Sequence, residues 1–162
     1  MPKGILLRVD GSFESVNLPE KSENMEEMLT LIGSEDLFLG ILACDSDSAR
    51  TIFLFLDVYN DFHDETFGKK PPLNQFIAQN SKAQIFGDVI VYLSEPEESS
   101  GEERIYDLTL TIEDLKHLMK VVEIREGVFR SNVLFEVLDD QKQRKELDEI
   151  LAKVDIKNYT DE

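Results

Sequence analysis

Residues 37–59 read LFLGILACDSDSARTIFLFLDVY and hold the pattern that decides the fold. Two apolar runs, residues 37–44 and 51–56, flank the polar connector Asp45-Ser46-Asp47-Ser48. Continuous apolar runs of this length are typical of strands that are covered on both faces. Asp and Ser side chains hydrogen-bond to nearby backbone groups in turns, so the chain can reverse direction in the connector. The stretch therefore predicts a hairpin at the centre of a sheet.

A second hairpin is expected around Asp10-Gly11-Ser12, between the strand-like residues 5–9 and 13–18. Asp-Gly is a strong hairpin signal because both residues tolerate positive φ. The loop has either two residues, Asp10 and Gly11, or three residues, which would place Arg8 across from Glu14 as an opposite-charge pair. Both registers stay open at this point.

Helical and strand periodicities place the other elements. Residues 24–32 start with capping-box spacing between Asn24 and Glu27, and Gly33 follows as a stop signal. A short helix is expected over residues 73–79, and a strand with one apolar face over 83–93. A clearer helix begins at Thr111, which has Asp114 at the capping-box position. After residue 122, the pattern predicts a strand or hairpin at 128–138 and a helix at 140–154.

These elements predict a single α+β domain over residues 1–162, with a largely antiparallel sheet built on hairpins and with helices packed on one side. A chain of 162 residues is long enough to bury a substantial core. Residues 95–104, EPEESSGEER, are nearly without apolar side chains, so we expect a flexible acidic insertion there. Residues 123–162 are expected to add a C-terminal strand and helix extension.

Composition excludes several classes of protein. The chain has 41% hydrophobic and 31% charged residues, and no apolar run approaches the roughly 18 residues of a membrane-spanning helix. The Met-Pro-Lys start lacks the pattern of a signal peptide, and the single cysteine, Cys44, cannot form an internal disulfide. We therefore expect an intracellular protein, cytoplasmic or nuclear, that is not secreted and does not bind a membrane.

The net charge is the most unusual property of the sequence. The chain has 34 acidic and 17 basic residues, which give a net charge of -17 at pH 7, and the pI is near 4.4. Such a field repels nucleic acid and attracts basic proteins in a salt-dependent manner. The simplest interpretation is that acidity maintains solubility. The functional alternative is that the acidic insertion docks a basic partner protein through its glutamates, Glu95, Glu97, Glu98, Glu102 and Glu103.

A divalent-metal site is the main alternative for the loop that follows residue 56. Carboxylate oxygens and an imidazole are available from Asp57, Asp61, His63 and Asp64, although their spacing matches no established metal motif. Solvated loop charge is the simpler explanation in so acidic a chain. The sequence also lacks a nucleophile elbow, a zinc-protease helix motif and a phosphate-binding glycine loop. We therefore expect no enzymatic activity and no cofactor.

Four features, taken in order, resemble a small family of unknown function that occurs in phages, plasmids and some large DNA viruses. They are the opening hairpin GILLRVDGSFESVNL, the helix ENMEEMLTLIG, the segment PLNQFIAQ leading into AQIFGDVIVYLSE, and the helix TLTIEDLKHLMKVV. The resemblance covers roughly residues 3–122 and rests on structural patterns, so it implies no catalytic residues. The chain departs from the family pattern in its acidic insertion and after Val122. The resemblance implies an accessory protein of a virus or mobile element.

Three functional hypotheses follow. The first is a non-enzymatic module whose acidic surface engages a basic, nucleic-acid-handling protein, with carboxylates in place of phosphates. The second is a homodimer or a subunit of a larger assembly that uses an apolar interface in residues 128–138 or in the C-terminal helix. The third is a small metal-dependent enzyme built on the carboxylates and histidine of residues 57–65. The first is our working hypothesis, and it includes no direct binding to nucleic acid.

Overall fold

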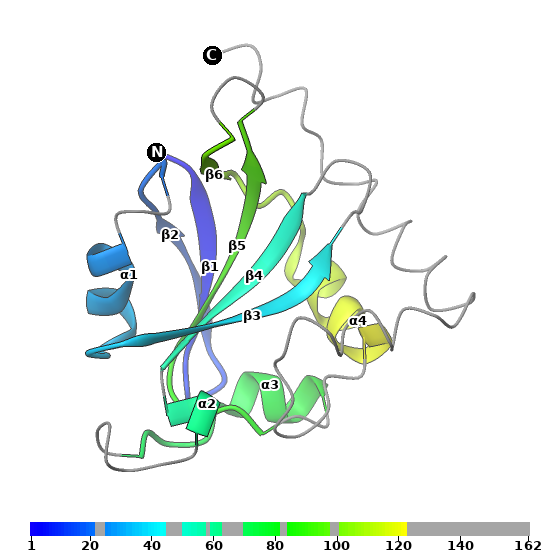
Figure 1. Ribbon diagram of the computed structural model, residues 1–162. Coiled ribbons are helices and arrows are strands. Elements are labelled where there is room, and N and C mark those ends of the chain that lie inside the picture. Colours follow the sequence, from blue (N-terminus) through cyan, green and yellow to red (C-terminus); the bar gives the residue numbers. More distant parts are fainter. Residues whose placement is uncertain are drawn as a thin grey trace.

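A computed structural model of the protein describes residues 1–21, 25–44, 50–57, 59–62, 70–81, 84–97 and 101–122 (Figure 1). In chain order the elements are β1 (Lys3–Leu7), β2 (Phe13–Asn17), α1 (Met25–Ile32), β3 (Leu37–Cys44), β4 (Thr51–Asp57), α2 (Tyr59–Phe62), α3 (Gln75–Asn80), β5 (Val89–Pro96), β6 (Glu103–Tyr106) and α4 (Ile112–Val122). The strands form one sheet in the order β2-β1-β5-β4-β3, and β6 pairs with β5. All these pairs are antiparallel, which confirms the predicted α+β class. The predicted extension over residues 123–162 lies outside the described residues.

The centre of the sheet is β5. This strand pairs with β1, β4 and β6, and its side chains are buried from Val89 to Ser94. The sequence correctly predicted the hairpin of β3 and β4, which pair with one irregularity after Ile41. This hairpin is not central, however, because β3 forms the outer edge of the sheet within the described ranges. An apolar run shows that a strand is covered, but it does not show which strands lie beside it.

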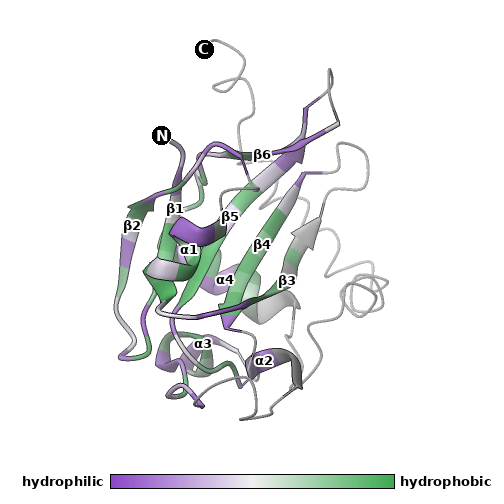
Figure 2. Ribbon diagram, turned by 60° about the vertical axis from the view of Figure 1, so that its left-hand side comes forward, coloured by the Kyte–Doolittle hydropathy of each residue, from purple (hydrophilic) through white to green (hydrophobic). Residues whose placement is uncertain are grey.

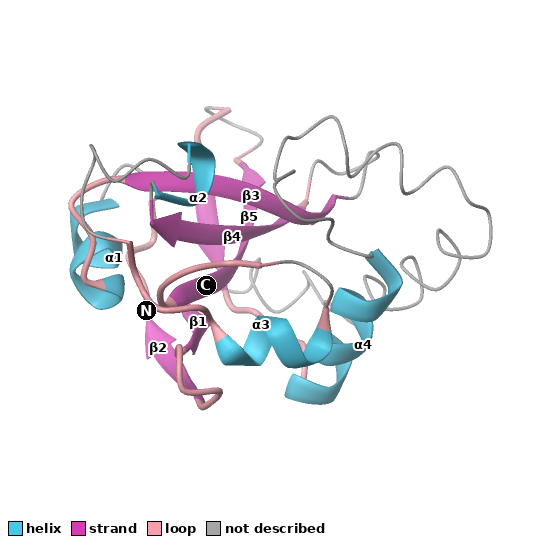
Figure 3. Cartoon of the chain, turned by 90° about the horizontal axis from the view of Figure 1, so that it is seen from below, coloured by secondary structure: helices cyan, strands magenta, loops and turns pink. Residues whose placement is uncertain are grey.

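Helices cover both faces of the sheet. Successive strand side chains point to opposite faces, so Leu54 and Val91 belong to one apolar core, whereas Phe55 and Ile90 belong to the other. The first core includes α3 and α4, which lie side by side in Figure 3. The second core includes Met28 of α1, and α1 and α4 lie on opposite sides of the sheet in Figure 1. The helices were expected on one side, but strands that are apolar on both faces present two surfaces that need cover (Figure 2).

The hairpin between β1 and β2 has a three-residue loop, residues 9–11. Arg8 N donates to Ser12 O over 2.9 Å, and Gly11 N donates to Arg8 O over 3.0 Å. Gly11 has φ 93°, the left-handed conformation that this turn requires at its last position. Neither predicted register is correct, because Arg8 lies across from Ser12. The expected ion pair between Arg8 and Glu14 forms nevertheless, as a diagonal contact.

Two helix ends agree with the sequence predictions. At the end of α1, Ser34 N donates to Leu29 O over 3.0 Å, and Gly33 adopts φ 68°. At the start of α4, the Thr111 hydroxyl accepts from Asp114 N at 3.1 Å, and the Asp114 carboxylate accepts from Thr111 N at 3.4 Å. This reciprocal pair is the predicted capping box.

A buried asparagine joins α3 to the sheet. The Asn74 side chain is fully buried, and its amide nitrogen donates to Leu7 O and to Gly87 O, each over 3.0 Å. Its amide oxygen accepts from Ile77 N at 3.1 Å and thereby caps α3. One side chain therefore fixes the start of α3, the end of β1 and the loop before β5.

Gly4 in β1 lies where a larger residue has no room. A Cβ atom there would lie 2.6 Å from Leu18 Cδ1 and 2.7 Å from Val91 O. The leucine side chain can shift, but the carbonyl oxygen belongs to the central strand. We expect Gly4→Ala to lower the free energy of unfolding by about 1–3 kcal/mol, as overpacking does in other cores. Urea denaturation measures this loss, with Ser15→Ala on the exposed face of β2 as the control. Equal stabilities of the two variants would contradict the prediction.

Candidate protein-interaction site

The described residues of the segment that was expected to form a flexible insertion, 95–97 and 101–104, continue the pairing of β5 with β6. Glu95 pairs with Arg104 in the strand register, and beyond the strands Glu97 N donates to Glu102 O over 2.8 Å. These hydrogen bonds give the backbone of residues 95–97 and 102–104 defined partners, whereas the flexibility of the insertion stays a prediction. We refer to residues 95–97 and 101–106 as the acidic hairpin.

Four of the five predicted partner-binding residues belong to the acidic hairpin: Glu95, Glu97, Glu102 and Glu103. Glu98 lies outside the described residues. The alternation of strand side chains places Glu95 on the face that α4 covers and Glu103 on the face that α1 covers. The hydrophilic ends of β5 and β6 lie at one end of the sheet (Figure 2), and the alternation of side chains places carboxylates on both of its faces.

Arg104 and Lys21 contact two of these carboxylates. Arg104 Nη1 lies 3.5 Å from Glu97 Oε1, and Lys21 Nζ lies 3.1 Å from Glu102 Oε2. Solvent reaches both pairs, so each contributes about 0–1 kcal/mol to stability. By sequence, the acidic hairpin has four glutamates and one arginine, so its formal charge is -3.

A buried serine anchors Glu103. Ser94 is 1% exposed, and its hydroxyl donates to Glu103 Oε2 over 2.7 Å and lies 3.1 Å from Arg104 O. Burial raises the pKa of the neighbouring Tyr92 phenol, and the negative charge of Glu103 raises it further. Replacement of Glu103 would therefore remove a hydrogen bond to a buried side chain as well as a charge.

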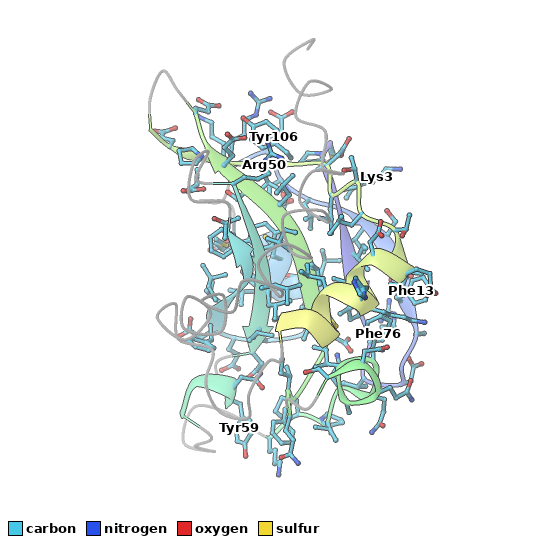
Figure 4. All side chains as sticks on the ribbon, turned by 90° about the vertical axis from the view of Figure 1, so that its right-hand side faces the viewer. Lys3, Phe13, Arg50, Tyr59, Phe76 and Tyr106 are labelled. Carbon is cyan, nitrogen blue, oxygen red and sulfur yellow. The ribbon has the colours of Figure 1, made fainter. Side chains whose placement is uncertain are left out.

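Tyr106 is the last residue of the acidic hairpin and lies at the same end of the sheet as Arg50 (Figure 4). The Arg104 guanidinium lies 5.6 Å from the centroid of its ring, in cation–π geometry. Partial burial raises the pKa of Tyr106, and the negative charges of Glu95 and Glu97 also raise it, whereas Arg104 opposes the shift. The hydroxyl is therefore protonated at neutral pH and can donate a hydrogen bond. Sequence reasoning missed Arg104 and Tyr106, although alternation in residues 103–106 was a signal for a strand.

Asp57 is the only residue of the predicted metal site whose side chain the structure describes. Its Oδ1 accepts a hydrogen bond from Tyr59 N, the first residue of α2, at 2.8 Å, a role that the sequence did not predict. Asp61 lies in α2, and His63 and Asp64 lie outside the described residues. Across the described ranges, no group of three His, Cys, Asp or Glu residues could hold a metal ion.

None of the helices in the described part of the chain is long and apolar enough to cross a membrane. Comparisons of the chain with protein-family models, with curated proteins and with solved structures find no match.

Proposed function

We propose that this protein is a non-enzymatic interaction module that binds a basic partner protein through the acidic hairpin. The main support for the proposal is the backbone pairing of β5 with β6. It holds the backbone of four glutamates, Glu95, Glu97, Glu102 and Glu103, beside one another. A partner that meets a preformed charged surface does not have to order it, so less of the binding free energy is lost on association. The net charge of -17 also attracts a basic protein over a distance and speeds the encounter.

The partner that we propose is a protein that handles nucleic acid. Such proteins carry basic surfaces that bind phosphates, and carboxylates at the acidic hairpin would occupy the same surfaces. The resemblance to a family from phages, plasmids and large DNA viruses supports this class of partner, with the protein as an accessory factor of a virus or mobile element. The same proposal places the interaction inside the cell.

Neutralising the acidic hairpin tests this proposal. We expect Glu95→Gln/Glu97→Gln/Glu102→Gln to weaken capture of the basic partner roughly tenfold, because each lost charge contact contributes about 0.2–1 kcal/mol. Glu103 stays unchanged because Ser94 binds its carboxylate. The measurement is the amount of partner recovered by the tagged full-length protein from a lysate of the source cell or host.

The matched control is Glu26→Gln/Glu27→Gln/Glu35→Gln, which changes the net charge equally at exposed positions in and after α1. We expect this control to retain capture within about twofold, because it alters the overall field but not the proposed contact surface. Equal losses in the two variants would mean that net charge alone drives binding and would overturn the assignment to the acidic hairpin.

A further inference from the structure

An apolar groove lies between the β1–β2 hairpin and the segment that links β6 to α4. Its volume is about 400 Å³, within the range of ligand-binding pockets. The apolar part of its lining comes from Ile5, Phe13, Leu108, Leu110 and Ile112, and the polar part includes Lys3, Glu14 and Asp107. Figure 4 shows Lys3 and Phe13 on the same side of the molecule. We refer to this feature as the β2 groove.

Hydrogen bonds between β1 and the linker fix one wall of the β2 groove. Lys3 N donates to Asp107 Oδ1 over 2.7 Å, and Leu108 N donates to Lys3 O over 2.9 Å. These bonds hold the linker alongside β1, so Leu108 remains half-buried at the wall. The β2 groove is therefore set by backbone contacts and does not depend on side-chain rotamers alone.

Phe13 forms part of the opposite wall. Its side chain is 48% exposed, although its ring packs edge-on against Phe76 with centroids 5.9 Å apart. Exposed aromatic side chains are typical of protein contact surfaces, because they add a large apolar area at a small cost in conformational entropy. Phe13 is thus held in position while half of its surface still faces solvent.

The β2 groove adjoins the acidic hairpin. Tyr106, the last residue of the acidic hairpin, is followed directly by Asp107 and Leu108 of the groove. Tyr106 and Leu108 both pack against the core that α3 and α4 share with the sheet. An extended ligand on this face of the sheet could therefore contact both the β2 groove and Glu95 of the acidic hairpin.

We propose that the β2 groove receives a large apolar side chain from the same partner segment whose Lys and Arg residues contact the acidic hairpin. This inference rests on the proposed function and adds an apolar anchor to it. Charge complementarity favours this occupant, because a basic peptide is attracted by the net charge of -17, whereas a second copy of the chain is repelled. Charge attraction would raise the association rate, and burial of the apolar side chain would lengthen the lifetime of the complex.

Three synthetic 12-residue peptides test the inference on the full-length protein. The first carries two Leu and four Lys residues, the second has Ser in place of Leu, and the third has Gln in place of Lys. Titrations followed by fluorescence anisotropy give affinities, and backbone amide NMR shifts locate the contacts. We expect the first peptide to shift residues 13–15 and 107–112 as well as the acidic hairpin. The Leu-to-Ser peptide should bind about tenfold more weakly and shift only the acidic hairpin.

The outcomes separate the two proposals. Equal binding of the Leu and Ser peptides, with shifts in the acidic hairpin alone, would overturn the apolar anchor but leave the proposed function intact. If neither Lys peptide shifts the acidic hairpin, the proposed function fails. Equal binding of the Gln and Lys peptides at the β2 groove would identify an apolar ligand site that does not recognise charge. It would overturn the proposal that one partner segment supplies both the apolar anchor and the basic residues.

Protein variants provide a second test of the apolar anchor. Leu108→Ser should weaken binding of the Leu-Lys peptide about tenfold, whereas Leu31→Ser, at a 37% exposed position of α1, should leave binding unchanged. Phe13→Ser is a second groove variant at a more exposed position, in case Leu108→Ser disturbs folding. Unchanged binding in a folded groove variant would contradict the proposal.

Discussion

Replacing Asn74 with alanine is expected to lower the free energy of unfolding by about 3–5 kcal/mol. The substitution removes the cap on α3, which is typically worth about 1 kcal/mol. It also leaves the carbonyl oxygens of Leu7 and Gly87 without the amide donors that they have now. Because an unsatisfied buried polar group costs about 1–3 kcal/mol, these two losses exceed the loss of the cap. Urea denaturation of the purified variant measures the change.

Asn74→Asp separates the two contributions. The aspartate keeps an acceptor for Ile77 N, but it cannot donate to the two carbonyl oxygens, so we expect it to restore little stability. Asn17→Ala, at an exposed position of β2, serves as the control and should change stability by less than about 0.5 kcal/mol. A loss below about 1 kcal/mol in Asn74→Ala would show that α3 is not held to the sheet as described.

Phe55→Ala is expected to lower the free energy of unfolding by about 3–5 kcal/mol as well. Phe55 is fully buried in the core between α1 and the sheet, together with Met28 and Tyr92. Truncation removes a large apolar surface and leaves a cavity that close-packed neighbours cannot fill completely. Thermal or urea denaturation, monitored by circular dichroism, gives the difference from the unmodified protein.

Phe13→Ala is the matched control for the core substitution. Phe13 is 48% exposed and makes one edge-on aromatic contact, so its truncation should cost about 1 kcal/mol. A loss for Phe55→Ala no larger than that of the control would contradict the second core, and with it the conclusion that helices cover both faces of the sheet.

Local features of the fold were predictable from the sequence. The α1 stop at Gly33 and the α4 capping box at Thr111 and Asp114 depend on residues within one or two turns, and both appear in the structure. The β3–β4 hairpin was predictable for the same reason, because two apolar runs and a short polar connector define it. Chemistry that acts over a few residues can be recognised without knowledge of the rest of the chain.

Long-range arrangement was not predictable in the same way. The choice of β5 as the central strand depends on pairing between Ile5 and Val91, far apart in sequence. The assignment of α1 to one face and α4 to the other depends on which core has room for each helix. Hydrophobic periodicity identifies a buried face, but it does not identify the surface that covers this face.

The glutamates of the candidate site were proposed from the composition of the sequence, but their place on paired strands was not predicted. Glutamates of residues 95–103 were identified from charge alone, and their low apolar content suggested disorder. In the described residues, the backbone at Glu95 and Glu103 has strand partners because β5 continues to Pro96 and pairs with β6. Arg104 and Lys21 also offset part of the repulsion between the carboxylates. No pattern in the sequence indicated that these residues would pair.

The most direct test of the account is the salt dependence of partner capture by the tagged full-length protein, with parallel washes at about 50 mM and about 500 mM salt. Captured proteins are identified by mass spectrometry and then competed with duplex DNA. We predict a basic nucleic-acid-binding protein that is retained at low salt, lost at high salt and displaced by DNA. A partner that resists both high salt and DNA, or the absence of any enriched protein at low salt, would contradict a charge-driven interaction through the acidic hairpin.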